Sequence, residues 1–147
     1  MVNVRNGRME DIFQLKKLMR QLCKRYDRTF YEESWVLDLK YKFETNPKGI
    51  FVAEEENGDI IGMILVDVGR DPYSGAQLAQ LQNFVVDEKV RHEGIGSALL
   101  DAAIEFCDDY KISSIQINAR RQNENLIKLF EKFGFKEIFF VMERESD

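Results

Sequence analysis

The spacing of hydrophobic and polar residues predicts a strand and two helices in the first third of the chain. Residues 2–5 alternate in polarity as a short strand does. Apolar residues then recur every three or four positions over residues 12–26, which is typical of an amphipathic helix. A second helix is expected over residues 34–43, because the turn signal Asn46-Pro47 follows it.

Three strands are expected in the middle of the chain. Residues 50–55 and 60–68 are rich in β-forming residues and flank Asn57-Gly58, a strong signal for an antiparallel hairpin. Residues 77–86 read as a third strand whose last three positions are all apolar, which favours burial on both faces.

The last third predicts helix, strand, helix and strand. An apolar stripe over residues 95–110 indicates a core helix, and residues 114–118 alternate as a short strand. A last helix ends before Gly134, and residues 135–142 are expected to close the domain as a strand. This order indicates an α/β (α+β) fold with a mixed sheet, and no linker or repeat divides the single domain 1–147.

Composition narrows the class of protein. A chain of 147 residues with 44% hydrophobic residues can bury its own core. No apolar run approaches the roughly 18 residues of a membrane span, and the charged first residues are unlike a secretory signal, so we expect a cytoplasmic protein without a membrane partner. Cys23 and Cys107 lack a metal-binding or redox spacing and are expected to be buried, and we expect no metal.

The net charge of −5 is unevenly distributed, with +4 over residues 1–48 and −9 over residues 49–147. This balance argues against nucleic acid as a partner, since that needs a basic surface over most of the domain. A cationic substrate remains compatible with it.

Residues 84–100 carry the most informative pattern, a strand followed by a glycine-containing loop and a helix. Gly94 and Gly96 let backbone amides face outward at the helix start, where the helix dipole also favours a diphosphate. A dinucleotide fingerprint would need a third glycine at Leu99 and an acidic residue at Asn118, and no P-loop motif exists in the chain. A loop for the diphosphate of an acyl-CoA and a plain turn before a helix both remain open at this point.

Two longer motifs distinguish these alternatives. Residues 91–96, Arg-His-Glu-Gly-Ile-Gly, match the pattern [Q/R]xxGx[G/A], and residues 123–135 are similar to NxxAxxLYEKxGF. In this order and spacing they resemble the GNAT superfamily of acyl-CoA-dependent N-acyltransferases over nearly the whole chain. The resemblance implies a mostly antiparallel central sheet of about six or seven strands with a splayed strand pair, flanked by about four helices.

The resemblance also implies an activity: transfer of an acetyl group from acetyl-CoA, as co-substrate, to a primary amine of a small molecule, peptide or protein. In this family a strand backbone pairs with the pantetheine arm and loop amides bind the diphosphate. An asparagine contacts the cofactor, although a plain helix N-cap is the alternative role here. A homodimer is common among such proteins. The cofactor-binding positions implied are Phe84, Val85, Val86, Arg91, His92, Glu93, Gly94, Ile95, Gly96, Ser97, Asn123 and Phe130.

The chain departs from the family at the positions that carry acid and base chemistry. Phe130 stands where many members have a tyrosine that protonates the leaving thiolate, although it also suits a core aromatic. Gln82 and Asn118 are amides where other members have a glutamate base, and amides cannot act as bases. The only histidine, His92, falls in the diphosphate loop, which argues against its acting as a base.

The catalytic residues therefore stay unassigned. Water held by Gln82 and Asn118, or a side chain such as Tyr31, Tyr73 or Asp67, could take the proton. We expect direct attack of the amine on acetyl-CoA without an acyl-enzyme. The alternative function is an acyl-CoA-binding module with weak or vestigial catalysis.

Overall fold

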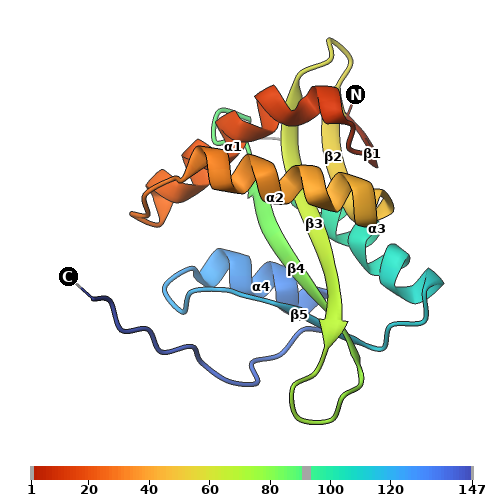
Figure 1. Cartoon of the computed structure of the whole chain (residues 1–147), viewed down its shortest axis with the longest axis vertical. Helices are drawn as coiled ribbons and strands as arrows, with labels where there is room; N and C mark the ends of the chain where they lie inside the picture. Colours follow the sequence, from red (N-terminus) through yellow and green to blue (C-terminus); the bar gives the residue numbers. More distant parts are fainter. Residues whose placement is uncertain (1, 91–93, 147) are drawn as a thin grey trace.

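The computed structural model describes residues 2–90 and 94–146, and within them five strands form one mixed sheet (Figure 1). The strands lie side by side in chain order, each antiparallel to the next except for the parallel pair β4 and β5. The strands are β1 (Val2–Asn6), β2 (Ile50–Glu55), β3 (Ile60–Arg70), β4 (Gln77–Val86) and β5 (Ser114–Ile117). This confirms the mixed, mostly antiparallel sheet, with fewer strands than the expected six or seven.

Two helices cover each face of the sheet. The helices α1 (Ile12–Arg25) and α2 (Glu32–Thr45) pack on one face, and α3 (Ile95–Asp109) and α4 (Glu124–Lys132) pack on the other. Figure 1 shows α1 and α2 crossing in front of the strands with α3 behind them. Among the described residues, no helix is both long enough and apolar enough to cross a membrane.

Each face has its own hydrophobic core, which explains the nearly continuous apolar run in β3. Leucines of α1 and α2 pack against one set of strand residues: Ile50, Val52, Met63, Leu65 and Val85. The apolar stripe of α3 packs against the alternate set: Ala53, Ile61, Ile64, Val66, Ala79 and Leu81. The sheet is thus buried between two helix layers. Successive side chains of a strand point to opposite faces, so neighbouring residues enter different cores.

The expected strand over residues 135–142 is wrong. Gly134 ends α4 in the left-handed conformation with φ 91°, and Phe135 still packs against the α3 core. From there residues 136–146, which we call the tail, run without regular structure, and Figure 1 shows them leaving the body of the molecule. A strand needs a partner edge for its backbone groups, and within the described residues the tail has none.

A bulge in β4 changes which face its side chains occupy. The pairing with β3 passes from Met63 opposite Val85 to Leu65 opposite Gln82, so β4 carries one extra residue. Asn83 lies there with φ 51°, in the left-handed region that asparagine tolerates better than most residues. Before the bulge the odd-numbered residues face α3, whereas after it Val85 faces α1 and α2.

The strands β4 and β5 stay paired over only part of their length. Their register ends with Leu81 opposite Ile117, while β4 continues to Val86. Beyond that point the β5-facing edge of β4 has no strand partner among the described residues. This is the splayed pair that the family resemblance implied.

Candidate functional site

The N-terminus of α3 presents backbone amides beside the end of β4. Gly94 precedes the helix with φ 92°, and a Cβ there would meet nothing within 4 Å. In the described part of the chain, the first helical bond runs from Ala98 N–H to Gly94 C=O at 2.8 Å. The amides of Ile95, Gly96 and Ser97 precede that bond, so they have no acceptor within the helix and mark its positive end.

Three predicted members of the loop, Arg91, His92 and Glu93, lie outside the described residues. Their roles toward a cofactor stay predictions.

Gly96 allows three elements to meet behind these amides. A Cβ at Gly96 would lie 3.2 Å from Cζ of Phe84, which is a tight contact, and 3.5 Å from Cδ2 of Leu129, so α3 packs closely against β4 and α4 at this glycine. The rings of Phe84 and Phe130 pack with centroids 5.8 Å apart. The structure thus brings together Phe84, Gly96 and Phe130, which lie far apart in the sequence.

The predicted cofactor residues on α4 have structural roles of their own. Phe130 is 4% exposed and also packs against Phe135 at 6.0 Å, so it is a core aromatic. The Asn123 Oδ1 accepts from the Leu126 N–H at 3.2 Å, which is the N-cap contact named as its alternative role. A contact from either residue to a cofactor stays a prediction.

The last residues of β4 offer backbone rather than side chains. The side chain of Val85 is buried in the α1 and α2 core, and Phe84 and Val86 pack against the α3 core. Because β5 has ended, the polar backbone groups on that side of β4 face a gap in the sheet. An extended ligand with amide groups could pair with them as a further strand does.

Amide side chains line the face of β4 that looks toward α1 and α2. Gln80 stands opposite Asp67 of β3 and Gln116 of β5, and its Nε2 donates to Asn118 Oδ1 at 3.4 Å. Gln82 lies on the same face two residues on. The only carboxylate in this cross-strand row is Asp67, whose place beside Gln80 depends on the register and could not be read from the sequence.

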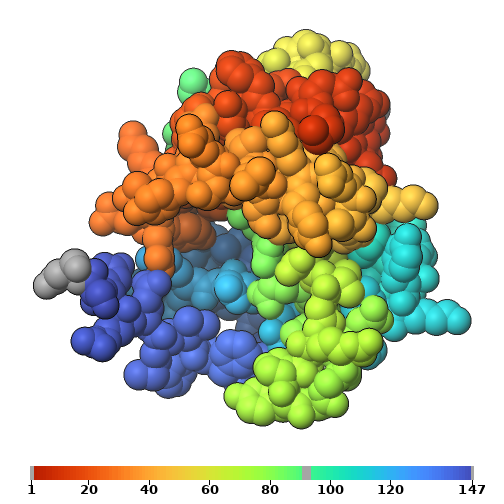
Figure 2. Space-filling model, in the orientation of Figure 1, coloured from red at the N-terminus to blue at the C-terminus, as the bar shows by residue number. Residues whose placement is uncertain are grey.

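Figure 2 shows the surface hollowed between α2 and the C-terminal third of the chain, with β4 at the back of the hollow, which we call the central cleft. Two contacts connect the end of α1 to the opposite wall. Arg120 lies over the ring of Tyr26 at 4.6 Å, and Arg28 forms an ion pair with Glu143 of the tail at 3.0 Å. The cleft thus meets the sheet on the face that carries Gln80 and Gln82.

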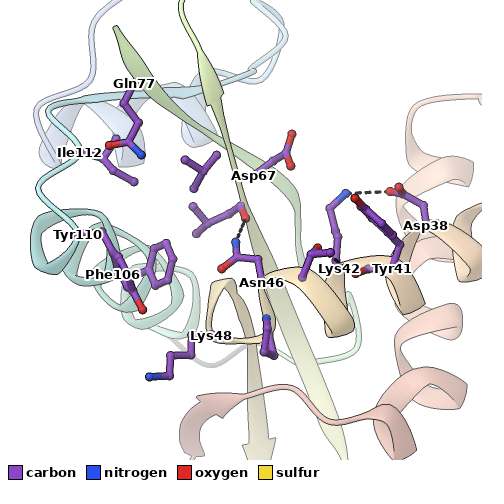
Figure 3. Close-up of a pocket in the computed structure, with 14 residues that line it drawn as sticks. Asp38, Tyr41, Lys42, Asn46, Lys48, Asp67, Gln77, Phe106, Tyr110 and Ile112 are labelled. Carbon is purple, nitrogen blue, oxygen red and sulfur yellow. Dashed lines mark hydrogen bonds and ion pairs between the residues drawn. The ribbon is translucent and has the colours of Figure 1, made fainter.

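A separate pocket of about 760 Å³ lies at the other end of β4 (Figure 3). It is bounded by the end of α2, the uncovered edge of β3 and the end of α3, and includes Asp38, Asp67 and Tyr110. Its lining extends along β3 to Val66, which pairs with Leu81 of β4, so about 17 Å of strand separates it from Val86. Sequence reasoning missed this pocket, which is not the predicted cofactor site.

Neither cysteine is placed as a nucleophile. Cys107 is fully buried, and burial together with the nearby Asp108 raises its pKa to about 11. Burial also raises the pKa of Cys23.

Among the described residues, no group of three or more His, Cys, Asp or Glu side chains could hold a metal ion.

The chain belongs to the acetyltransferase (GNAT) family, whose model matches residues 14–135. It is similar to an N-alpha-acetyltransferase of Sulfurisphaera tokodaii, with 32% identity over 146 residues that cover 92% of this chain and 80% of that protein. It is also similar to the L-amino acid N-acetyltransferase AaaT of Escherichia coli, with 29% identity over 83 residues that cover 54% of this chain and 49% of that protein.

The match with three curated relatives spans only about half of their length, between 49% and 60%. Among solved structures, a predicted acetyltransferase of Clostridium acetobutylicum with acetyl-CoA superposes with a TM-score of 0.80. That alignment covers 99% of this chain and 96% of the other at 19% identity, so it supports the fold.

Proposed function

We propose that the protein transfers an acetyl group from acetyl-CoA to a primary amine by direct attack. The observation that carries this proposal is the junction of β4 and α3 in a member of the acetyltransferase family. There, strand backbone without a partner lies beside the amide-bearing start of a helix.

The residues at this junction fit an acyl-CoA. The amides of Ile95, Gly96 and Ser97 would bind the diphosphate, with Arg91, His92 and Glu93 completing the loop. The open space beside Gly94 leaves room for phosphate oxygens. The backbone of Phe84, Val85 and Val86 would pair with the amides of the pantetheine arm. Acetyl-CoA supplies the thioester carbon that the amine attacks.

The backbone around the bulge would polarise the thioester carbonyl. The N–H of Val86 or of a neighbouring residue is the donor that we assign to this oxygen. Holding both reactants in the cleft removes much of the entropic barrier, so substantial acceleration needs no dedicated acid. A thiol of pKa about 8.5 leaves as thiolate at pH 7 for roughly 2 kcal/mol.

The amide side chains Gln82 and Asn118 limit which kind of amine the protein can acetylate, because neither of them is a base. A lysine-like amine of pKa about 10.4 is neutral in about one molecule in 2,500 at pH 7, and would need a strong base. A peptide α-amine of pKa about 7.7–8.0 is neutral in roughly one molecule in ten, so water held by Gln82 and Asn118 is sufficient to remove its proton. The names of the two relatives, an N-alpha-acetyltransferase and an L-amino acid N-acetyltransferase, agree with an α-amine acceptor.

The experiment measures cofactor binding first and acetyl transfer second. Thermal unfolding is compared with acetyl-CoA, CoA, NAD and ATP, and stabilisation by NAD but not by CoA would contradict the assignment. Thiol release is then measured with two peptides, one with a free N-terminus and no lysine, the other with a blocked N-terminus and one lysine. We expect turnover of the first peptide, and equal or faster turnover of the second would overturn the choice of an α-amine.

An acyl-CoA-binding module with vestigial catalysis is the second candidate. The observation that favours it is the absence of a carboxylate at Gln82 and Asn118 and of a hydroxyl at Phe130. Stabilisation by acetyl-CoA without turnover of any peptide, amino acid or small amine would select this function.

A further inference from the structure

The second half of β3 has a free edge. The neighbouring strand β2 pairs with β3 only as far as Ile50 opposite Leu65, while β3 continues to Arg70. Residues 66–70 therefore pair with β4 on one side and, within the described part of the chain, with no strand on the other. This edge lines the separate pocket of about 760 Å³, between the end of α2 and the end of α3 (Figure 3). A free strand edge inside a walled pocket is a template for an extended ligand.

Val68 presents a backbone donor and a backbone acceptor to this pocket. The Val66 C=O accepts a bond from Asn46 Nδ2 at 3.1 Å, which shows that the backbone groups of Val66 point toward the free edge. Every second residue of a strand directs its N–H and C=O to the same side, so those of Val68 point there too. Among the described residues neither group has a hydrogen-bond partner. Val68 is 37% exposed, so a ligand can reach both groups.

The walls of the pocket suit the alternating side chains of an extended peptide. On one side of β3 the rings of Phe106 and Tyr110 pack together with centroids 4.6 Å apart (Figure 3). On the other side lie Tyr41 and Lys42 of α2, and Asp38 holds the Lys42 Nζ at 2.8 Å. A peptide added to the edge of β3 points successive side chains to opposite faces of the sheet. Its side chains therefore meet the aromatic wall and the α2 wall in turn.

Asp67 connects this pocket to the central cleft. It lines the pocket, and it also stands opposite Gln80 on the face of the sheet that the cleft meets. Its side chain is exposed, and no ion pair among the described residues uses its carboxylate. Val68 lies opposite Ala79, three residues along β4 from Gln82. About 10 Å along the strand and about 10 Å across two strand spacings give roughly 14 Å from Gln82 to the free edge, which four or five extended residues span.

We propose that the acceptor is an extended peptide whose later residues add a strand to the free edge of β3. The inference rests on the proposed function, in which the N-terminal α-amine of the acceptor reacts beside Gln82. The peptide passes over Asp67, which favours a cationic side chain at its second or third position, and from about the fifth residue it bonds to the N–H and C=O of Val68. The acceptor class is thus a peptide, or a protein with an unfolded N-terminus, of at least about seven residues. A free amino acid is too short to reach the edge.

The first test is binding without turnover, measured by calorimetric titration of two N-acetylated peptides into the full chain. Both peptides begin with the same three residues, the third a lysine; one ends there, and the other continues with five alternating valines and threonines. The longer peptide is expected to bind with a Kd about tenfold lower or more, because it alone reaches the edge of β3. Equal affinities for the two peptides would overturn the proposal.

A pair of variants tests the part played by the backbone of Val68. Val68→Pro removes the N–H at the free edge, and an edge strand tolerates proline where that group has no partner in the sheet. Val68→Ala is the matched control, because it shortens the same side chain and keeps the N–H. The Kd for the longer peptide should rise by about tenfold in Val68→Pro and by less than about threefold in Val68→Ala. Equal values in the two variants would overturn the proposal.

The same bond can be removed from the peptide if the proline variant does not fold. Residues five to seven of the longer peptide are N-methylated one at a time and titrated into the unaltered protein. Methylation of at least one of these residues should raise the Kd by about tenfold, because it removes a donor or blocks the approach of the strand. Unchanged affinity at all three positions would refute pairing with β3.

Thiol-release kinetics then show whether the bound peptide is the acceptor. With free N-termini, the longer peptide should have a kcat/KM about tenfold higher than the shorter one, mainly through KM, and Val68→Pro should remove most of that difference. Asp67→Asn should remove the preference for lysine over glutamine at the third position. Binding through Val68 without turnover would contradict both the acceptor role and the proposed function. Turnover with equal kcat/KM for the two lengths would overturn this inference alone.

Discussion

The indole N–H of Trp35 donates to the side-chain oxygen of Asn83 at 3.2 Å, across 48 residues of sequence. Asn83 is the extra residue of the β4 bulge and has a left-handed backbone with φ 51°. The bond therefore connects α2 to the point where β4 turns its last residues toward the junction with α3. Phe30 supports the indole with an edge-on ring contact at 5.9 Å.

Trp35→Phe removes the N–H and keeps most of the ring. We expect the free energy of unfolding to fall by about 1 kcal/mol, as for an ordinary lost hydrogen bond. We expect kcat to fall by roughly three- to tenfold, because the bulge orients the part of the β4 backbone that we propose binds acetyl-CoA. Thiol-release kinetics and urea unfolding measure the two effects.

Two further variants distinguish positioning from stability. Phe30→Leu weakens the packing around Trp35 without removing the bond to Asn83, so it should cost stability and leave kcat unchanged. In an Asn83→Gly background, Trp35→Phe should change kcat little further, since the bond is already absent. A Trp35→Phe enzyme with lower stability but normal kcat would make the pair purely structural.

Gly94→Ala tests the cofactor site against a matched position. Gly94 and Gly58 share φ 92°, and a Cβ would meet nothing within 4 Å at either, but Gly58 lies in the turn between β2 and β3. Both substitutions to alanine should cost stability by roughly 1–2 kcal/mol through the left-handed backbone. Only Gly94→Ala should raise the Kd for CoA, by about tenfold or more, since it perturbs the amides at the proposed diphosphate site. Calorimetric titration measures this, and equal affinities for the two variants would argue against a site at α3.

Local signals explain why much of the fold could be predicted. The bounds of Ile50–Glu55 and Gln77–Val86 follow from β-rich composition and flanking turn residues, and the structure confirms both. The bulge at Asn83 could not be predicted, because its bond partner is Trp35 on a distant helix. The tail has the local pattern of a strand, but pairing depends on an edge that no local pattern reveals.

Part of the candidate site could likewise be predicted from local sequence, and part depends on how the elements pack. The start of α3 could be predicted because Gly94 and Gly96 mark it in the sequence. The neighbourhood of Gln80, Asp67 and Asn118 depends on the register of three strands, which the sequence leaves free. The sequence showed that Phe130 lacks a hydroxyl, whereas its burial against Phe84 emerges only from packing.

Asp11→Asn should destabilise the protein near neutral pH. Asp11 is 5% exposed, and its carboxylate accepts two bonds from Arg5, at 2.9 and 3.0 Å, and one from the Arg8 N–H at 2.8 Å. Burial alone would raise the pKa of Asp11, but the bonds from Arg5 and Arg8 more than offset it and lower the pKa. We expect a loss of about 2–4 kcal/mol in the free energy of unfolding at pH 7, because Arg5 keeps a half-buried charge with one partner fewer.

The pH dependence of that loss follows from the direction of the shift. Because the folded pKa is lowered, the stabilisation is present above the unfolded pKa of about 3.9 and disappears as the pH falls through the folded value. Urea unfolding at neutral and acidic pH should therefore show the two proteins converging below pH about 4. Asp38→Asn, which breaks an exposed ion pair with Lys42 at 2.8 Å, is the control and should be nearly neutral. Equal losses for the two variants would be inconsistent with this account.

The cysteines should differ in reactivity. Desolvation, with a contribution from Asp108, raises the pKa of Cys107 to about 11, so roughly one thiol in a thousand is ionised at pH 8. Iodoacetamide at pH 8 is expected to label the partly exposed Cys23 and to spare Cys107 until urea unfolds the protein, as read by mass spectrometry of the peptides. Under the proposed direct attack, brief incubation with acetyl-CoA should leave both cysteines unacetylated. An acetyl group on either that is passed to the amine would replace direct attack with a two-step mechanism.

Phe130→Tyr restores the hydroxyl that many family members have at this position. Because Phe130 is buried between Phe84 and Phe135, the new hydroxyl should lower the free energy of unfolding without ligand by about 1 kcal/mol or more. If the ring edge faces the cofactor sulfur, kcat should rise or stay unchanged, because the hydroxyl gives the leaving thiolate a proton donor. Phe135→Tyr makes the same chemical change on a neighbouring, partly exposed ring and should leave kcat unaltered. A large loss of kcat in Phe130→Tyr alone would instead mean that the shape of this ring, pressed against Phe84, sets the position of β4 beside the acetyl group.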